Sequence, residues 1–93
     1  MRAIKQTGQF KRDLKQEAKG LHRKVLQDDF VALVETLASD RSLDLKYGDH
    51  PLSGDWIDHR DCHIKPDLVL IYRKPDSTVL QLVRLGSHSE LGL

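Results

Sequence analysis

Residues 63–76, HIKPDLVLIYRKPD, contain the tripeptide Lys-Pro-Asp twice, on either side of a mainly apolar run. Proline sets φ at the second position of a turn and aspartate can bond to its own backbone, so each copy predicts a tight turn. The run between them, 68–73, is therefore expected to be a strand, with further strands at 57–64 and 78–85. Such short connections favour an antiparallel meander, and the apolar segment 68–72 predicts a central strand covered on both faces.

The residues before this meander predict a strand, two helices and an irregular connection. Residues 2–6 are expected to form an edge strand. Apolar residues then recur near the helical period in a first helix ended by Gly20 and in a second helix from about Arg23 to Ser39. These apolar positions are Phe10, Leu14, Ala18 and Leu21, then Leu26, Phe30, Leu33, Val34 and Leu37. Residues 40–55 are expected to be irregular and closed by Trp56, a core anchor. The prediction is an α+β fold in a single domain, residues 1–93.

Charge is distributed unevenly along the chain. The formal net charge is only +1. Residues 1–24, however, carry eight Lys or Arg against two acidic residues, whereas the remainder carries seven against twelve. Such asymmetry is typical of a surface that faces a polyanion, although a solvated helix face has the same pattern. In the first reading, Lys11, Lys15 and Lys19 form a platform for a phosphate backbone.

The compartment is expected to be the reducing cytoplasm. The single cysteine, Cys62, has no partner for an internal disulfide or a cysteine-rich metal site. No N-terminal apolar segment of signal-peptide type is present, and the apolar run at 68–72 is far shorter than the roughly 20 residues that cross a bilayer. We therefore expect no membrane association.

The predicted meander brings chemically active residues to one edge of the sheet. There the first strand ends at His63, the second begins after Asp67 and the third ends before His88. Asp76 lies at the opposite edge, roughly 20 Å away. His50 can reach the same edge as His63, because the connection that follows it is long enough to fold back.

Metal binding is one interpretation of these histidines. His59 and His63 share a strand face but lie about 13 Å apart, too far to share one ion. His50, His63, Asp67 and His88 could bind a metal through long-range convergence. The interpretation that we favour needs no metal and no cofactor.

Histidines with a carboxylate, but without an obvious nucleophile, suit a reaction in which the substrate supplies the nucleophile. In RNA the 2′-hydroxyl can attack the adjacent phosphate if one group removes its proton and another protonates the departing 5′-oxygen. A cation near the phosphate would stabilise the transition state, and Arg84 and Arg60 are candidates. Each arginine could instead form a salt bridge at the sheet surface.

The full pattern resembles the YafQ branch of the RelE/ParE toxin superfamily. It consists of DHPLxGxW at 49–56, RDxH at 60–63, Pro66-Asp67 before an apolar strand, and RxGxH at 84–88. The resemblance implies a RelE-like small domain and a toxin of a type II toxin–antitoxin module that cuts mRNA in the ribosomal A site without metal. It also implies three partners: a cognate antitoxin, the 70S ribosome with its mRNA, and operator DNA through the antitoxin complex.

Carried over by position, the family's catalytic residues correspond to His50, His63, Asp67 and His88. We expect His88 to be the general acid, Asp67 or His50 to take the proton from the 2′-hydroxyl, and His63 to orient or stabilise the phosphate. The branch has an aromatic residue near its C-terminus, which falls at about Gly92 here, between Leu91 and Leu93. His59 stands where an aromatic residue is familiar; of two interpretations, a substitute stacking residue or an exposed side chain, we favour the exposed one.

Two alternatives remain from the sequence alone. A ParE-like toxin with the same fold would bind DNA gyrase and cut no RNA, and fold alone does not separate the two activities. An inactive member would bind only its antitoxin and operator. The cluster of histidines and aspartate favours the endoribonuclease.

Overall fold

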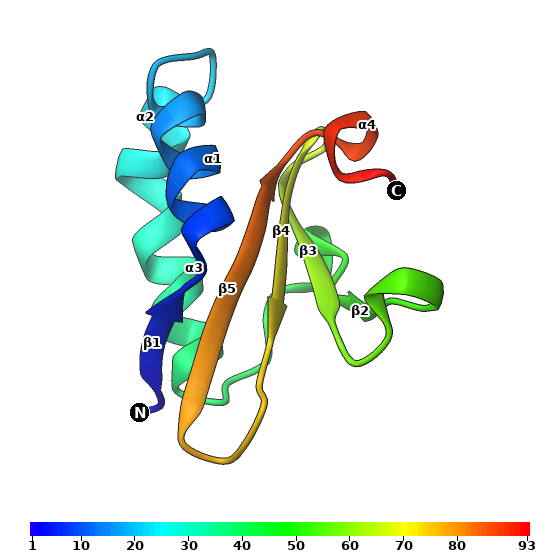
Figure 1. Cartoon of the computed structure of the whole chain (residues 1–93). Coiled ribbons are helices and arrows are strands. Elements are labelled where there is room, and N and C mark those ends of the chain that lie inside the picture. Colours follow the sequence, from blue (N-terminus) through cyan, green and yellow to red (C-terminus); the bar gives the residue numbers. More distant parts are fainter.

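The protein is a five-stranded sheet with helices on both faces, and the computed structural model describes all residues from 1 to 93 (Figure 1). The strand order is β1-β5-β4-β3-β2. Their bounds are Ala3–Gln6 for β1, His50–Pro51 for β2, Arg60–Lys65 for β3, Leu68–Arg73 for β4 and Val79–Gly86 for β5. The strands β3, β4 and β5 form the predicted antiparallel meander, and β1 is an edge strand parallel to β5. The α+β prediction is confirmed.

Two helical segments cover one face of the sheet (Figure 1). The first, α1, spans Gly8–Ala18 and begins at Thr7, whose hydroxyl accepts a hydrogen bond from the Phe10 main chain. The second is continuous from 23 to 38 and consists of α2 (Arg23–Val25), a π-helical turn η1 (Leu26–Phe30) and α3 (Val31–Ala38). Both helices occur where they were predicted; the π-helical turn was not.

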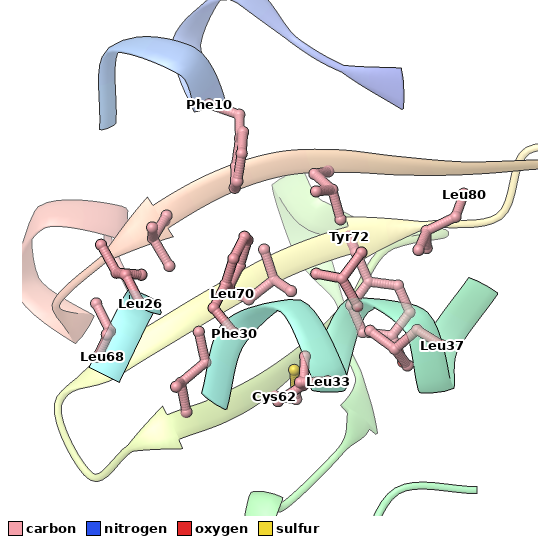
Figure 2. Packing of buried hydrophobic residues seen from close by; sticks show 14 of the residues in the cluster. Phe10, Leu26, Phe30, Leu33, Leu37, Cys62, Leu68, Leu70, Tyr72 and Leu80 are labelled. Atoms are coloured by element: carbon pink, nitrogen blue, oxygen red, sulfur yellow. The ribbon is translucent and has the colours of Figure 1, made fainter. Parts of the chain in front are cut away.

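The main core lies between these helices and the sheet, as Figure 2 shows. Phe10 and Phe30 stack here with ring centroids 6.1 Å apart. The whole predicted stripe of the second helix is buried. In the first helix the prediction for Leu21 was wrong: α1 ends at Ala18, and Leu21 is 98% exposed in the turn that follows.

The opposite face of β4 carries a smaller cluster. Val69 and Ile71 pack there against Leu91 of the short helix α4 (His88–Leu91). The half-buried Trp56 packs against this cluster and not within the main core. β4 is therefore covered on both faces, as predicted, although Trp56 anchors the smaller of the two cores.

Two boundaries in the middle of the chain differ from the prediction. The connection 40–55 contains the 3₁₀ turn η2 (Leu45–Tyr47) and the two-residue strand β2, and a further 3₁₀ turn, η3, spans Gly54–Trp56. β3 begins at Arg60 and not at 57, because Ile57 ends η3 and Asp58 has a left-handed backbone with φ of 68°. No helix is long and apolar enough to span a membrane.

One buried carboxylate ties α1 to the end of β5. Asp13 accepts hydrogen bonds from Arg84 Nε at 2.8 Å, from the Leu85 main-chain N–H at 3.0 Å and from Gln9 at 3.0 Å. Burial raises the pKa of Asp13, but the hydrogen bonds from Arg84, Gln9 and Leu85 outweigh it, and the net pKa is lowered. The contribution of Asp13 to stability is therefore present above about pH 4 and is lost as the pH falls through its folded pKa.

We predict that Asp13→Ala lowers the free energy of unfolding by about 3–5 kcal/mol, because Arg84 and the Leu85 N–H lose their buried partner. Urea denaturation at pH 7 measures the change, with the exposed Asp28→Ala as control. The difference in the free energy of unfolding between Asp13→Ala and wild type should become smaller as the pH falls from 6 to 3. Equal effects of the two substitutions would contradict the role of Asp13.

Candidate functional site

Three of the predicted site residues form a hydrogen-bonded chain at the end of the sheet where β3 ends and β4 begins. His63 Nε2 lies 3.1 Å from His88 Nε2, and His88 Nδ1 lies 3.1 Å from Asp67 Oδ1. The strand register explains the convergence, because Val69 of β4 is paired with His63 on one side and with Gly86 on the other. The meander therefore brings the three side chains together as expected.

The short helix α4 sets the position of His88. Its first turn is closed by a capping box in which the Ser87 hydroxyl accepts from the Glu90 N–H, and the Glu90 carboxylate accepts from the Ser87 N–H. His88 is the first residue of this helix, and its main-chain N–H donates to Asp67 Oδ1 at 3.2 Å. Asp67 thus contacts both the backbone and the ring of His88.

His50 joins the row from β2. Its ring stacks on that of His63 with centroids 6.1 Å apart, and His63 stacks in turn on His88 at 5.1 Å. The preceding residue, Asp49, fixes this segment by accepting hydrogen bonds from the Tyr72 hydroxyl at 2.6 Å and from Arg60 Nε at 3.2 Å. His63 is therefore the central ring, with His50 and His88 on its two sides.

A buried carboxylate lies beneath His50. Asp61 is 2% exposed and is paired with His50 across β2 and β3. Its Oδ1 lies 3.0 Å from His50 Nδ1 but accepts no hydrogen bond. Burial raises the pKa of Asp61, and only the charge of protonated His50 and the other histidines opposes this effect. Asp61 was not among the predicted site residues, although strand alternation places it on the same face as His63.

The neighbours of each ring determine where its protons lie. His50 Nδ1 lies 2.8 Å from the Gly48 carbonyl oxygen and close to Asp61, and both groups only accept protons. Nδ1 therefore carries the hydrogen, which leaves Nε2 of neutral His50 with a free lone pair. His88 Nδ1 faces the Asp67 carboxylate and likewise carries a hydrogen. The short Nε2–Nε2 contact of His63 and His88 then requires one shared hydrogen between these two atoms.

The two Lys-Pro-Asp aspartates have different environments. Hydrogen bonds from the ring and the main chain of His88 lower the pKa of Asp67. Asp76 accepts from the main chain and the hydroxyl of Thr78, both at 2.7 Å, in the turn at the far end of β4. Asp76 is therefore a turn residue without a histidine neighbour.

The predicted cations lie outside this row of rings. Arg84 is paired with Asp13, and Arg60 with Asp49. Lys11, Lys15 and Lys19 are exposed along α1. Gln16 of the same helix reaches Glu90 of α4 at 3.5 Å, so one side of α1 adjoins α4.

His59 was expected to be exposed, but its side chain is not free in solvent. It is half-buried, its ring meets Trp56 edge-on at 5.4 Å, and its Nδ1 lies 3.0 Å from the Ile57 carbonyl. It packs beside the η3 turn and is not part of the row of rings. No set of three or more His, Cys, Asp or Glu side chains is arranged to hold a metal ion.

Comparison with known proteins finds similarity along nearly the whole chain. A family model described as "Bacterial toxin of type II toxin-antitoxin system, YafQ" matches residues 2–92. An Escherichia coli K12 protein named "mRNA interferase toxin YafQ" is 36% identical over 92 residues, which are 97% of this chain and 95% of that protein. A chain of the E. coli DinJ–YafQ complex superimposes with a TM-score of 0.81, 33% identity and 98% coverage of both chains. A metal-bound toxin from Helicobacter pylori has a TM-score of 0.83 and 46% identity, covering 98% of this chain and 99% of that one.

The burial of Asp61 predicts a pH-dependent stability change. Because its pKa is raised in the folded state, its contribution is most favourable at low pH and is lost as the pH rises through the folded pKa. The melting temperature of the Asp61→Asn variant should therefore rise relative to that of the wild type as the pH increases from 4 to 7. Thermal unfolding across this range tests this, with the exposed Asp55→Asn as control. A pH-independent difference would show that Asp61 carries no such charge penalty.

Proposed function

The chain belongs to the YafQ family of toxins from type II toxin–antitoxin systems, and from this premise we propose that it is an endoribonuclease that cuts mRNA in the ribosomal A site. The nucleophile is the 2′-hydroxyl of the RNA itself. The row of His50, His63 and His88, ending in Asp67, carries the proposal, because it offers a base and an acid on two sides of one ring.

His50 is the general base in this proposal. The Gly48 carbonyl and Asp61 keep the hydrogen on Nδ1, so Nε2 can accept the proton of the 2′-hydroxyl. Asp61 is then a positioning residue that favours this tautomer and stabilises the cationic ring after proton transfer. Asp67, the other candidate base, is less suited, since its lowered pKa makes it a weak proton acceptor.

His88 is the general acid. The Asp67 carboxylate stabilises its imidazolium form, and the Nε2 hydrogen shared with His63 can pass to the departing 5′-oxygen. A proton held between His63 and His88 also places positive charge where the phosphate becomes more negative. The reaction balances: one proton leaves the 2′-oxygen for His50, one passes from His88 to the 5′-oxygen, and a cyclic phosphate remains.

The exposure of the site fits a large substrate. The side chains of His50 and His88 are 51% and 42% exposed, so a polymer can reach them without a lid opening. Lys11, Lys15 and Lys19 would contact the phosphates of RNA bound beside α4. Arg84 and Arg60 are already paired with Asp13 and Asp49 outside the row of rings, so we assign them no contact with the phosphate.

The proposed partners follow from the family. The E. coli relative has been solved with DinJ, its antitoxin, which supports a cognate antitoxin for this chain. We further propose that translating ribosomes present the mRNA and that the antitoxin complex binds operator DNA.

We predict that His88→Ala reduces mRNA cleavage by about 10²–10⁴-fold, the usual contribution of one general acid. Primer extension on one mRNA, with and without translating ribosomes, measures it. Breaks that require both translation and His88 are the expected result. Intact RNA with folded, growth-inhibiting wild-type protein would contradict cleavage and favour gyrase binding.

The repeated tripeptide supplies an internal control. Asp67→Asn should slow cleavage, because His88 loses its carboxylate partner, whereas Asp76→Asn should leave the rate unchanged. Both aspartates are exposed turn residues with lowered pKa values, so general effects of charge removal are matched. Equal rates for the two variants in the same assay would remove Asp67 from the mechanism.

The reaction is also predicted to need no bound transition metal, although the H. pylori relative was solved with a bound metal. Protein treated with chelator and desalted should cleave as fast as untreated protein on ribosomes in magnesium buffer. The histidines supply both proton transfers, so a metal has no step to perform. Loss of cleavage that zinc or copper restores would establish a metal-dependent reaction instead.

A further inference from the structure

A cleft of about 340 Å³ opens beside His63, away from the other three site residues. Asp29 of η1, Lys46 and Tyr47 of η2, and Lys65 of β3 line it together with His63. We refer to it as the Tyr47 cleft. His63 is the one residue that it shares with the row of histidines, so a ligand in the cleft would lie next to the reacting groups without occupying their place.

Backbone geometry fixes the η2 turn against His63. The Asp44 carboxylate caps the turn by accepting from the Lys46 N–H, and Gly48 ends it in the left-handed region with φ of 58°. A Cβ at Gly48 would lie 3.0 Å from His63 Nδ1. Only glycine allows both the backbone conformation and this close approach. The cleft and the central ring of the site are therefore positioned by the same turn.

The lining offers a ring, two cations and a carboxylate. Tyr47 is half-buried and rests partly on the main core, with the Lys46 ammonium 5.1 Å from its ring centroid. Lys46 and Lys65 are exposed, and neither takes part in any of the six ion pairs of the structure. Asp29 is also exposed and can accept from an amino group. This combination matches a nucleotide, which has an aromatic base and an anionic phosphate.

The remaining aromatic residues are occupied elsewhere. Phe10, Phe30 and Tyr72 belong to the main core, and Trp56 packs against the smaller cluster. At the chain end, Leu91 is buried and Gly92 only caps α4. Tyr47 is thus the one Phe, Tyr or Trp side chain that lines a cleft bounded by a site histidine.

We propose that the Tyr47 cleft binds the base of the RNA nucleotide next to the cut phosphodiester. The base packs against the Tyr47 ring, and Lys46 and Lys65 contact the phosphate on the side away from His88. The cleft is then the part of the site that reads sequence, whereas the histidines act on the backbone common to all nucleotides. This inference rests on the proposed ribonuclease activity.

The test compares variants on translating ribosomes supplied with four mRNAs that differ only in the base next to the cut. Tyr47→Ala should reduce cleavage of the preferred mRNA by about 5- to 150-fold, the range of one base–aromatic stack, and reduce the preference among bases. Tyr47→Phe should retain both, because its ring remains. Lys46→Gln combined with Lys65→Gln should raise the apparent KM and leave kcat unchanged, whereas Lys5→Gln on the distant β1 should change neither.

Each outcome decides the inference. The two exposed lysines can be replaced without disturbing the core. An unchanged KM in that double variant would therefore overturn the proposal that the Tyr47 cleft binds RNA, even if Tyr47→Ala folded poorly. A folded Tyr47→Ala protein that cuts at the same positions and rate as wild type would also overturn the proposal. So would a cleft variant that loses antitoxin binding but keeps normal cleavage. Wild-type protein that cuts none of the mRNAs would overturn the proposed function itself, whereas the other outcomes leave that function intact.

Discussion

The site depends on the position of one residue in the sheet. Val69 lies at the start of β4, and its backbone is paired with His63 on β3 and with Gly86 on β5. These two pairings place the end of one strand and the beginning of α4 at the same height. A shift of β3 by one residue would turn His63 to the other face of the sheet, and a shift of β5 would move α4 and His88 along the sheet edge. The geometry of the candidate site is therefore a consequence of strand register, which the packing of both faces of β4 maintains.

Chemistry and stability make opposite demands on the carboxylates. Asp13 is buried with several donors, and its charge stabilises the fold. Asp61 is buried without a hydrogen bond to Oδ1, and this burial raises its pKa and disfavours its charged form. In our account that cost is retained because it orients His50. Asp67 lies at the surface, and its hydrogen bonds from His88 outweigh the effect of burial and favour its charged form.

The sequence predicted the meander and the meeting of His63, Asp67 and His88, because proline and aspartate mark turns locally and antiparallel pairing then determines which strand ends are adjacent. It did not predict β2 or the burial of Asp61 beside His50, which depend on how the loop before β3 folds back. Leu21 followed the helical period but lies beyond the helix end, where period alone gives no information. The Tyr47 cleft required three segments distant in sequence to be placed in space.

The central claim is that the RNA supplies its own nucleophile and the protein supplies only proton transfer and charge. The most direct measurement is cleavage of an mRNA in which the single 2′-hydroxyl at the cut position is replaced by hydrogen or methoxy, in the presence of translating ribosomes. The account predicts that cutting stops at that position alone, and that the unmodified mRNA yields a 2′,3′-cyclic phosphate and a 5′-hydroxyl. Cleavage of the modified mRNA at the same position would contradict it, since another nucleophile would then be attacking the phosphate.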